Sequence, residues 1–279
     1  MSSRQRPYRV IQWGTGSVGK VMLAAILDHR PDLELVGVRV YSDDKDGADV
    51  GTLLGRDPVG VRATIDPAAV LEVEADCVLY TPRDPSIADV CALLASGKNV
   101  VTTAFLFHPK RIDAADRDRL AAACRQGGTS VHGTGINPGN LSAVLPLALT
   151  GMSRTVDKIT LQERADWSVY ESTSITFDNM GFGQPVDAIS PTATRSLAFT
   201  SALFVEQVWF LADALRADID EITTSFTRAA TLEEHVRSAS VATAMQALNA
   251  VPAVCEAPPG FASAASLPLI RSYAGFGNV

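Results

Sequence analysis

Residues 9–20, RVIQWGTGSVGK, decide the fold of this chain. Five residues of strand character, 9–13, lead directly into a glycine-rich stretch, and a helical pattern of apolar residues follows. Gly14 permits a tight turn, Gly16 leaves room for a pyrophosphate beside the backbone, and Gly19 lets the helix pack closely on the strand. An anion is favoured at the start of that helix, because unpaired N–H groups and the helix dipole meet there. A strand, a turn and a helix in this order predict a dinucleotide-binding turn made by Gly14, Thr15, Gly16, Ser17, Val18 and Gly19, with a purely structural turn as the alternative.

The composition describes an ordinary globular protein. The chain has 279 residues, of which 47% are apolar and 20% charged, so it is long enough for two domains. A formal net charge of −7 disfavours nucleic acid and anionic membranes as partners. The four cysteines are scattered without metal-ligand spacing, so we expect neither a metal site nor a disulfide framework.

Neither the first residues nor the longest apolar region indicates export or membrane insertion. The first seven residues are polar and lack the apolar run of a signal peptide. The longest apolar region, residues 197–215, is interrupted by Glu206, Gln207 and Asp213, which indicates a buried helix rather than a membrane span. We therefore expect a cytoplasmic protein.

Strands and helices alternate through the first half of the chain. Residues 33–41, 61–65, 75–80, 98–104 and 129–135 read as strands, and residues 86–95 and 113–125 as helices. This alternation predicts an α/β fold with a Rossmann-type, doubly wound parallel sheet over residues 1–150. Ligands of such sheets bind beyond the carboxyl ends of the strands, where loops at 80–82, 102–104 and 135–140 converge. Ordinary turn chemistry is the alternative for any single residue of these loops.

The end of the second strand bears on the choice of nicotinamide cofactor. An acidic residue there would accept hydrogen bonds from the adenosine ribose of NAD, but the strand ends at Tyr41. Ser42 and Lys45 could donate to the extra phosphate of NADP, and Arg39 lies close by, whereas Asp43 and Asp44 argue the other way. We expect NADP and leave NAD open; a solvated loop is the alternative for the aspartates.

The second half has a different character. Residues 156–165 and 219–229 read as strands, residues 192–217 and 232–249 as helices, and residues 178–185 as a turn. We expect a smaller α+β domain over residues 151–231 for substrate binding or dimerisation, with residues 232–279 packing back on the first domain. Two strands make a thin sheet.

Six motifs together carry a resemblance to a known family: VIQWGTGSVGK, ADCVLYT, SGKNVVTT, GTGINPGN, FDNMGFGQP and NAVPAVCEAPPG. The chain resembles the dihydrodipicolinate reductase-like superfamily, and within it the branch of 2,4-diaminopentanoate dehydrogenase and the native amine dehydrogenases. The resemblance implies NAD(P)-dependent hydride transfer between a small amine or amino acid and its carbonyl or imine partner. It also implies a pyrophosphate site at Gly14, Thr15, Gly16, Ser17 and Val18, a ribose site at Ser42 and Lys45, a nicotinamide site at Thr81, Pro82 and Thr102, and a junction with the substrate pocket at Asn137, Pro138 and Gly139.

The sequence departs from this branch at the catalytic position. The His-rich, Lys-containing substrate motif of true dihydrodipicolinate reductases is missing, and members that act on amines place a glutamate just after the strand that ends near residue 103. This chain has AFLFHP at 104–109. His108, Glu163 or Asp166 could replace the glutamate, and Tyr80 or His108 could donate a proton to a cyclic imine; a structural or solvated role is the alternative for each.

Two further interpretations follow from these departures. A protein without the carboxylate could be a catalytically impaired nucleotide-binding protein that senses redox state or serves as an interaction module. The region around residues 226–232 also lacks several strands found in the family, so the second domain looks shortened. An open pocket completed by a second subunit, in a homodimer, would compensate for that.

Overall fold

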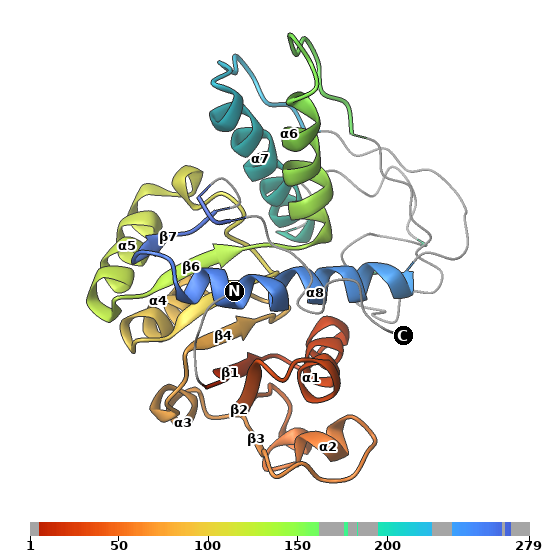
Figure 1. Ribbon diagram of the computed structural model, residues 1–279, viewed down its shortest axis with the longest axis vertical. Helices are drawn as coiled ribbons and strands as arrows, with labels where there is room; N and C mark the ends of the chain where they lie inside the picture. Colours follow the sequence, from red (N-terminus) through yellow and green to blue (C-terminus); the bar gives the residue numbers. More distant parts are fainter. Residues whose placement is uncertain are drawn as a thin grey trace.

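A seven-stranded parallel sheet forms the centre of the computed structural model, which describes residues 6–161, 176–177, 183, 195–224, 236–263 and 266–268. The strand order is β3-β2-β1-β4-β5-β6-β7 (Figure 1). The strands are β1 (Tyr8–Trp13), β2 (Leu33–Arg39), β3 (Ala63–Thr64), β4 (Cys77–Tyr80), β5 (Asn99–Thr102), β6 (Ser130–Gly133) and β7 (Gly260–Phe261). The order reverses between β1 and β4, and such a switch point is where α/β sheets bind ligands.

The helices between the strands complete a doubly wound fold. They are α1 (Ser17–His29), α2 (Val50–Leu53), α3 (Pro67–Glu72), α4 (Ile87–Ala95), α5 (Ala114–Gly127), α6 (Leu145–Thr150), α7 (Arg195–Leu215) and α8 (Val236–Cys255). Two short 3-10 turns, η1 (Asp43–Lys45) and η2 (Pro109–Arg111), and an irregular helical segment, η3 (Ile136–Val144), lie in the connections. The α/β class and the Rossmann-type sheet expected from the sequence are confirmed.

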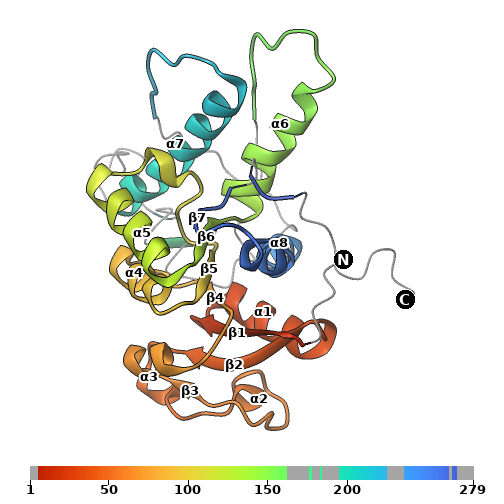
Figure 2. The same cartoon turned by 60° about the vertical axis from the view of Figure 1, so that its left-hand side comes forward.

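Each face of the sheet carries its own hydrophobic core. On one face Met22 and Leu23 of α1 pack with Leu248 and Val251 of α8. On the other face α3, α4 and α5 contribute a second cluster that includes Val70, Val90, Leu93 and Leu120. The turned view in Figure 2 shows α1 and α8 on one side of the sheet and α4 and α5 on the other. Burial on both faces explains why the strands read as continuous apolar runs rather than alternating patterns.

Local capping fixes where the helices begin. The Ser86 side chain accepts from the N–H of Asp89 at the start of α4, and Asp113 accepts from the N–H groups of Ala115 and Asp116 at the start of α5. Gly128 ends α5 in the left-handed conformation, with φ of 66°. These signals are local, so the sequence placed both helices within two residues of their observed bounds.

α8 packs on the parallel sheet and on α1, and β7 extends the sheet. α8 continues through Pro252 to Cys255, six residues beyond the end expected from the sequence, and β7 then pairs in parallel with β6 through Gly260 and Phe261. β7 was not predicted, because a two-residue strand leaves no periodic pattern.

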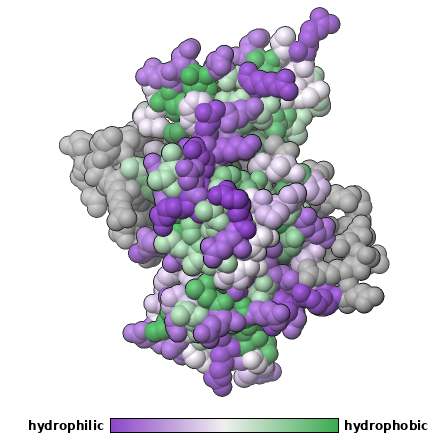
Figure 3. Space-filling view, turned by 90° about the vertical axis from the view of Figure 1, so that its left-hand side faces the viewer, coloured by the Kyte–Doolittle hydropathy of each residue, from purple (hydrophilic) through white to green (hydrophobic). Residues whose placement is uncertain are grey.

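α6 and α7 stand side by side at one end of the molecule (Figures 1 and 2). The sequence predicts a buried helix here, and this prediction is wrong for most of α7. Between residues 198 and 215 only Gln207, Phe210 and Ala212 are buried, and Phe199, Phe204 and Val208 are each about 40% exposed. Hydrophobic surface is visible at this end of the molecule in Figure 3. Among the described helices, α7 alone is long and apolar enough to cross a membrane, by length and composition only.

The strands expected in the second domain are not found where the structure describes the chain. Residues 156–161 and 219–224 form no strand, and the remainder of the two predicted strands lies outside the described residues. Most of the predicted turn at 178–185 lies outside them as well.

Candidate functional site

The glycine turn between β1 and α1 leaves no room for side chains at two positions. Gly14 has φ of 99°, and a Cβ atom there would lie 2.9 Å from the carbonyl oxygen of Thr81. A Cβ atom at Gly19 would collide with the carbonyl of Gly14. At Gly14 the turn lies close against the loop that follows β4, and at Gly19 α1 lies close against the turn. Both positions therefore require glycine.

Gly16 faces open space instead. An added Cβ atom would meet no atom within 4 Å, although the backbone conformation, with φ of −72° and ψ of −170°, suits any residue. Gly16 is also the N-cap of α1, where no side chain caps the helix. The first N–H groups of α1 therefore meet an open, uncapped space, which is the arrangement that a phosphate group requires.

The carboxyl ends of four strands lie level with one another. The sheet register pairs Trp13 with Tyr80, Tyr80 with Thr102, and Thr102 with Gly133. The loops that follow these residues therefore leave the sheet along one edge, beside the glycine turn. The structure thus brings together the three loops singled out from the sequence.

Gln12, a buried residue that the sequence reasoning missed, joins two of these loops. Its Nε2 donates to the carbonyl oxygen of Gly14 and to Oγ1 of Thr81, both at 2.8 Å. Thr81 also donates its backbone N–H to Trp13 at 2.8 Å. The pyrophosphate turn and the loop after β4 are therefore held in a fixed relation.

Thr102 and Pro82, which the resemblance places beside the nicotinamide, are both buried. Thr102 is fully buried, and its Oγ1 accepts from the N–H of Ala104 at 3.1 Å. Pro82 is buried too. Both residues shape the strand ends, whereas Thr81 remains partly exposed at the edge.

The end of β2 carries a stacked guanidinium group. The Cζ atom of Arg39 lies 4.7 Å from the ring centroid of Tyr41 and 5.7 Å from that of Trp13. Trp13 Nε1 donates to the Tyr41 hydroxyl at 2.8 Å, which fixes the two rings. Nε and Nη1 of Arg39 are buried and have no hydrogen-bond partner among the described residues. Buried donors without partners are costly, so these two groups are suited to receive a ligand.

Ser42 and Lys45 follow directly. Ser42 precedes η1, and its side chain makes no capping hydrogen bond there, while Lys45 is the last residue of η1. Both are half-buried, whereas Asp43 and Asp44 are exposed. Asp46 accepts from the N–H of Ile65 and so holds the loop.

Asn137, Pro138 and Gly139 lie in η3, directly after the end of β6. Gly139 has φ of 131° and donates its N–H to Oγ of Ser142 and to Oε1 of Gln207, both at 3.2 Å. A small cavity of about 60 Å³ lies beside this segment. Its lining comes from the end of β6, η3, α7 and α8, and includes Phe107, His132, Asn140, Gln207, Phe210 and Gln246.

His108 is held away from that cavity. Its Nε2 lies 2.8 Å from Oδ2 of Asp213, and its ring packs edge-on against Phe210. The backbone N–H of His108 donates to Oε2 of Glu206 at 2.7 Å. Arg111 pairs with the same Asp213, and these two contacts hold the pKa of the Asp213 carboxyl well below its usual range. Burial raises the pKa of Glu206. His108 thus joins the loop after β5 to α7 through these contacts, and its role as a proton donor stays a prediction.

Tyr80 is likewise committed to the fold. Its side chain is fully buried between Trp13 and Phe105, and its hydroxyl accepts from the N–H of Ser86 at 2.9 Å. Burial raises the pKa of this hydroxyl well above its ordinary value. These contacts tie the Tyr80 hydroxyl to the start of α4, and its role as a proton donor stays a prediction.

Phe105, near which the resemblance places a glutamate, is packed in the hydrophobic core. Phe105 is 8% exposed and belongs to the same cluster as Tyr80. The loop crosses Gly133, where a Cβ atom would collide with the carbonyl groups of Phe105 and Leu106. Glu163 and Asp166, which we considered as substitutes, lie outside the described residues. In the part of the chain that is described, no three His, Cys, Asp or Glu side chains are grouped to hold a metal.

The sheet, its switch point and the glycine turn together define an α/β protein of the dinucleotide-binding class. A curated amine dehydrogenase of Streptomyces virginiae is 34% identical over 220 residues, which make up 76% of this chain and 60% of that protein. The chain thus spans about 60% of the length of this relative. The match confirms the resemblance to the amine dehydrogenases that the motifs indicated.

Two further comparisons complete this finding. No family model matches the sequence. The solved structure of an amine dehydrogenase from Mycobacterium smegmatis superposes with a TM-score of 0.74 over 98% of this chain and 99% of that one, at 17% identity. At this identity the likeness shows a shared fold.

Proposed function

We propose that the chain is an NAD(P)-dependent oxidoreductase that transfers a hydride to or from a small amine or amino acid and its carbonyl or imine partner. The observation that carries the proposal is the open space at Gly16, beside an uncapped helix start at the switch point of the sheet. The similarity to an amine dehydrogenase supports the class of substrate. When bound, the nicotinamide ring supplies the hydride chemistry, so the protein needs to bind, orient and exclude water.

The residues present fit a dinucleotide. The N–H groups at the start of α1, with Gly14, Thr15, Gly16, Ser17, Val18 and Gly19, would hold the pyrophosphate. Gln12 keeps the turn and Thr81 in register, so the nicotinamide end of the site is fixed relative to its phosphate end. Asn137, Pro138 and Gly139 would close the site towards the substrate.

We propose NADP rather than NAD as the preferred cofactor. Arg39 offers two buried N–H donors without partners at the end of β2, and Ser42 and Lys45 follow within six residues. An arginine at this place accommodates the 2′-phosphate of NADP. The exposed Asp43 and Asp44 leave this interpretation open to NAD.

Replacing Arg39 tests the choice of cofactor. Arg39→Gln should raise the Kd for NADPH about tenfold or more, because a charge-assisted hydrogen bond is lost, and should change the Kd for NADH less than about twofold. Titration calorimetry with both cofactors measures this. Arg56→Gln, which removes a surface pair with Asp28, is the matched control. Equal weakening of both cofactors would contradict the assignment.

Turnover tests the activity itself. We expect NADPH oxidation with aldehydes or ketones at high ammonium, measured at steady state with a carbonyl panel. The packing of Phe105 in the core favours a second candidate, a nucleotide-binding protein with impaired catalysis, because the carboxylate that would bind ammonium is absent at that position. Cofactor binding without turnover, with or without ammonium, would favour this second candidate.

We propose a cytoplasmic homodimer. Leu141, Leu145 and Leu149 are spaced four residues apart and are 39%, 44% and 49% exposed. Phe204 and Val208 of the neighbouring α7 are about 40% exposed as well. Contiguous apolar surface of this kind is typical of a protein interface.

A further inference from the structure

The small cavity beside η3 carries no formal charge on the described residues that line it. Its volume of about 60 Å³ is enough for a group of a few non-hydrogen atoms. The lining side chains are apolar or are neutral amides and hydroxyls, and the one titratable residue among them is His132. Burial lowers the pKa of His132 to about 4, so this imidazole is neutral near pH 7.

His132 presents a hydrogen-bond acceptor to the cavity. Its Nδ1 lies 3.2 Å from the carbonyl oxygen of Ala262, which can only accept. Nδ1 therefore carries the proton, and Nε2 of the neutral ring is left with its lone pair. Nε2 makes no hydrogen bond to any described residue, although the side chain is only 4% exposed.

Gln207 presents a donor to the same cavity. Its Oε1 must be the atom near the N–H of Gly139, because that N–H can only donate, and Oγ of Ser142 lies 3.2 Å from the same oxygen. The amide nitrogen of Gln207 is therefore directed elsewhere and has no partner in the described part of the chain. The side chain is 3% exposed. Because Gln207 lines the cavity, its unused amide N–H groups are available to a ligand or to water there.

We propose that this cavity binds an uncharged carboxamide-like group, which donates to Nε2 of His132 and accepts from the amide nitrogen of Gln207. The inference rests on the proposed function, because the cavity adjoins the proposed junction of cofactor and substrate. Among the described residues that line the cavity, a carboxylate would find no cation and an ammonium group no anion, and burying either charge unpaired is costly. His132 and Gln207 are thereby specificity-determining residues. The carboxamide belongs either to the nicotinamide of the cofactor or to the substrate.

Titration calorimetry on the full chain with paired amides and acids tests the proposal. One arm compares NADP⁺ with nicotinic acid adenine dinucleotide phosphate, which differs only in the carboxylate. The other arm compares benzamide with benzoate, with and without NADPH. We expect the amide to bind at least about tenfold more tightly than the acid in one arm. Preference in the dinucleotide arm assigns the carboxamide to the cofactor, and preference for benzamide with NADPH bound assigns it to the substrate.

Gln207→Glu sharpens the test. A glutamate oxygen can still accept from Gly139, but the donor to the ligand is lost, so the preference for the amide should disappear. Ser130→Ala, on the same strand as His132 but outside the cavity lining, should retain it. Equal binding of amide and acid in both arms overturns the proposal, as does a preference that Gln207→Glu leaves unchanged. The wild-type comparison decides even where the variant does not fold.

Failure of the proposed function has a separate signature. If the proposed function is wrong, the protein binds neither NADPH nor NADH. The comparison of benzamide with benzoate on the free protein then still decides whether the cavity accepts a carboxamide.

Discussion

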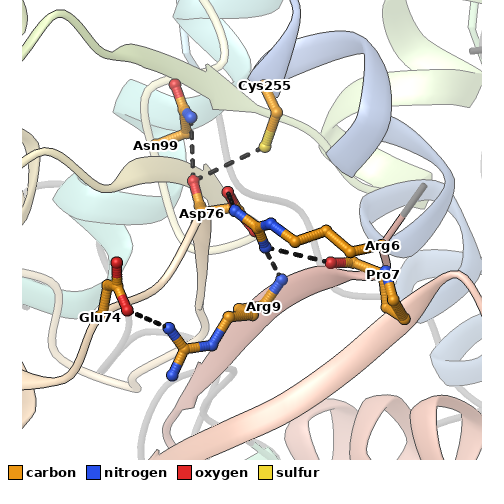
Figure 4. Close-up of polar contacts among 7 residues, drawn as sticks. All are labelled: Arg6, Pro7, Arg9, Glu74, Asp76, Asn99 and Cys255. Carbon is orange, nitrogen blue, oxygen red and sulfur yellow. Dashed lines mark hydrogen bonds and ion pairs between the residues drawn. The ribbon is translucent and has the colours of Figure 1, made fainter. Parts of the chain in front are cut away.

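Asp76 connects the amino-terminal ends of β1, β4 and β5 (Figure 4). Its carboxylate accepts two hydrogen bonds from Arg6, at 2.9 and 3.0 Å, and one from the N–H of Arg9 at 2.7 Å. Its backbone oxygen accepts from Nδ2 of Asn99 at 2.9 Å and from Sγ of Cys255 at 3.6 Å. These contacts lie at the amino-terminal ends of the strands, whereas the glycine turn follows the carboxyl end of β1. We therefore expect Asp76 to stabilise the fold.

Asp76→Ala should lower the free energy of unfolding by about 2 kcal/mol, because the N–H of Arg9 loses its acceptor. Glu74→Ala is the control: Glu74 pairs with Arg9 at 2.6 Å but is 92% exposed, so its removal should leave the free energy of unfolding unchanged. Urea denaturation measures both. Equal losses in the two variants would contradict the role of Asp76.

His132 makes stability depend on pH. Its folded-state pKa of about 4 lies below the ordinary value of 6.5, so the unfolded chain binds the proton more tightly. Stability is therefore lost as the pH falls from about 6.5 to about 4, by about 3 kcal/mol in total from this group.

His132→Gln should flatten the pH dependence of the unfolding free energy in that window, as measured by urea denaturation at several pH values. Ser130→Ala, which removes no titratable group, should keep the slope of the wild type. An unchanged slope in His132→Gln would show that the ring is not neutral and buried.

Single residues differ in how well the sequence predicted them. The glycine turn could be predicted, because its requirements concern the backbone and repeat in every such turn. The directions of Tyr80, Thr102 and His108 could not, because the loops that fold over a strand end decide which side chains they cover. Arg39 was noticed for its position alone, and Gln12 left no signal, since a buried polar residue in a strand looks like an ordinary interruption of the apolar pattern.

Strands and helices of the first half were predicted because their apolar runs are long and their caps local. β7 and the last turn of α8 depend on tertiary contacts with β6 and α1, which a local pattern does not show. The exposed face of α7 was missed for a related reason: an apolar helix face indicates burial against something, without saying whether the partner belongs to the same chain.

The apolar face of α6 gives a prediction for the proposed dimer. Leu145→Glu with Leu149→Glu should raise the dimer dissociation constant at least about tenfold, because two charges would enter an apolar contact. Light scattering over a dilution series measures this. The control is Val59→Glu, because Val59 is 38% exposed and lies in the loop after α2, outside α6 and α7. A monomeric wild type at all concentrations would rule out the dimer.

The molecule as a whole combines a Rossmann-type sheet that its sequence predicts well with a second half that its sequence predicts poorly. Alternating strands and helices dictate a parallel sheet, and a parallel sheet dictates where the ligand lies. No comparable rule governs residues 151–231, where the predicted pattern was short and two-stranded. The place of the proposed cofactor therefore follows from the sequence, whereas the proposed carboxamide site depends on side chains that converge from η3, α7 and α8.

The most direct test of the account is NADPH binding by Gly16→Val. The space beside Gly16 is open and its backbone conformation suits valine, so the variant should fold with an unchanged melting temperature. The new side chain should occupy the place of the pyrophosphate and weaken NADPH binding at least about a hundredfold in titration calorimetry. A folded Gly16→Val variant that binds NADPH as tightly as the wild type would contradict the proposed site.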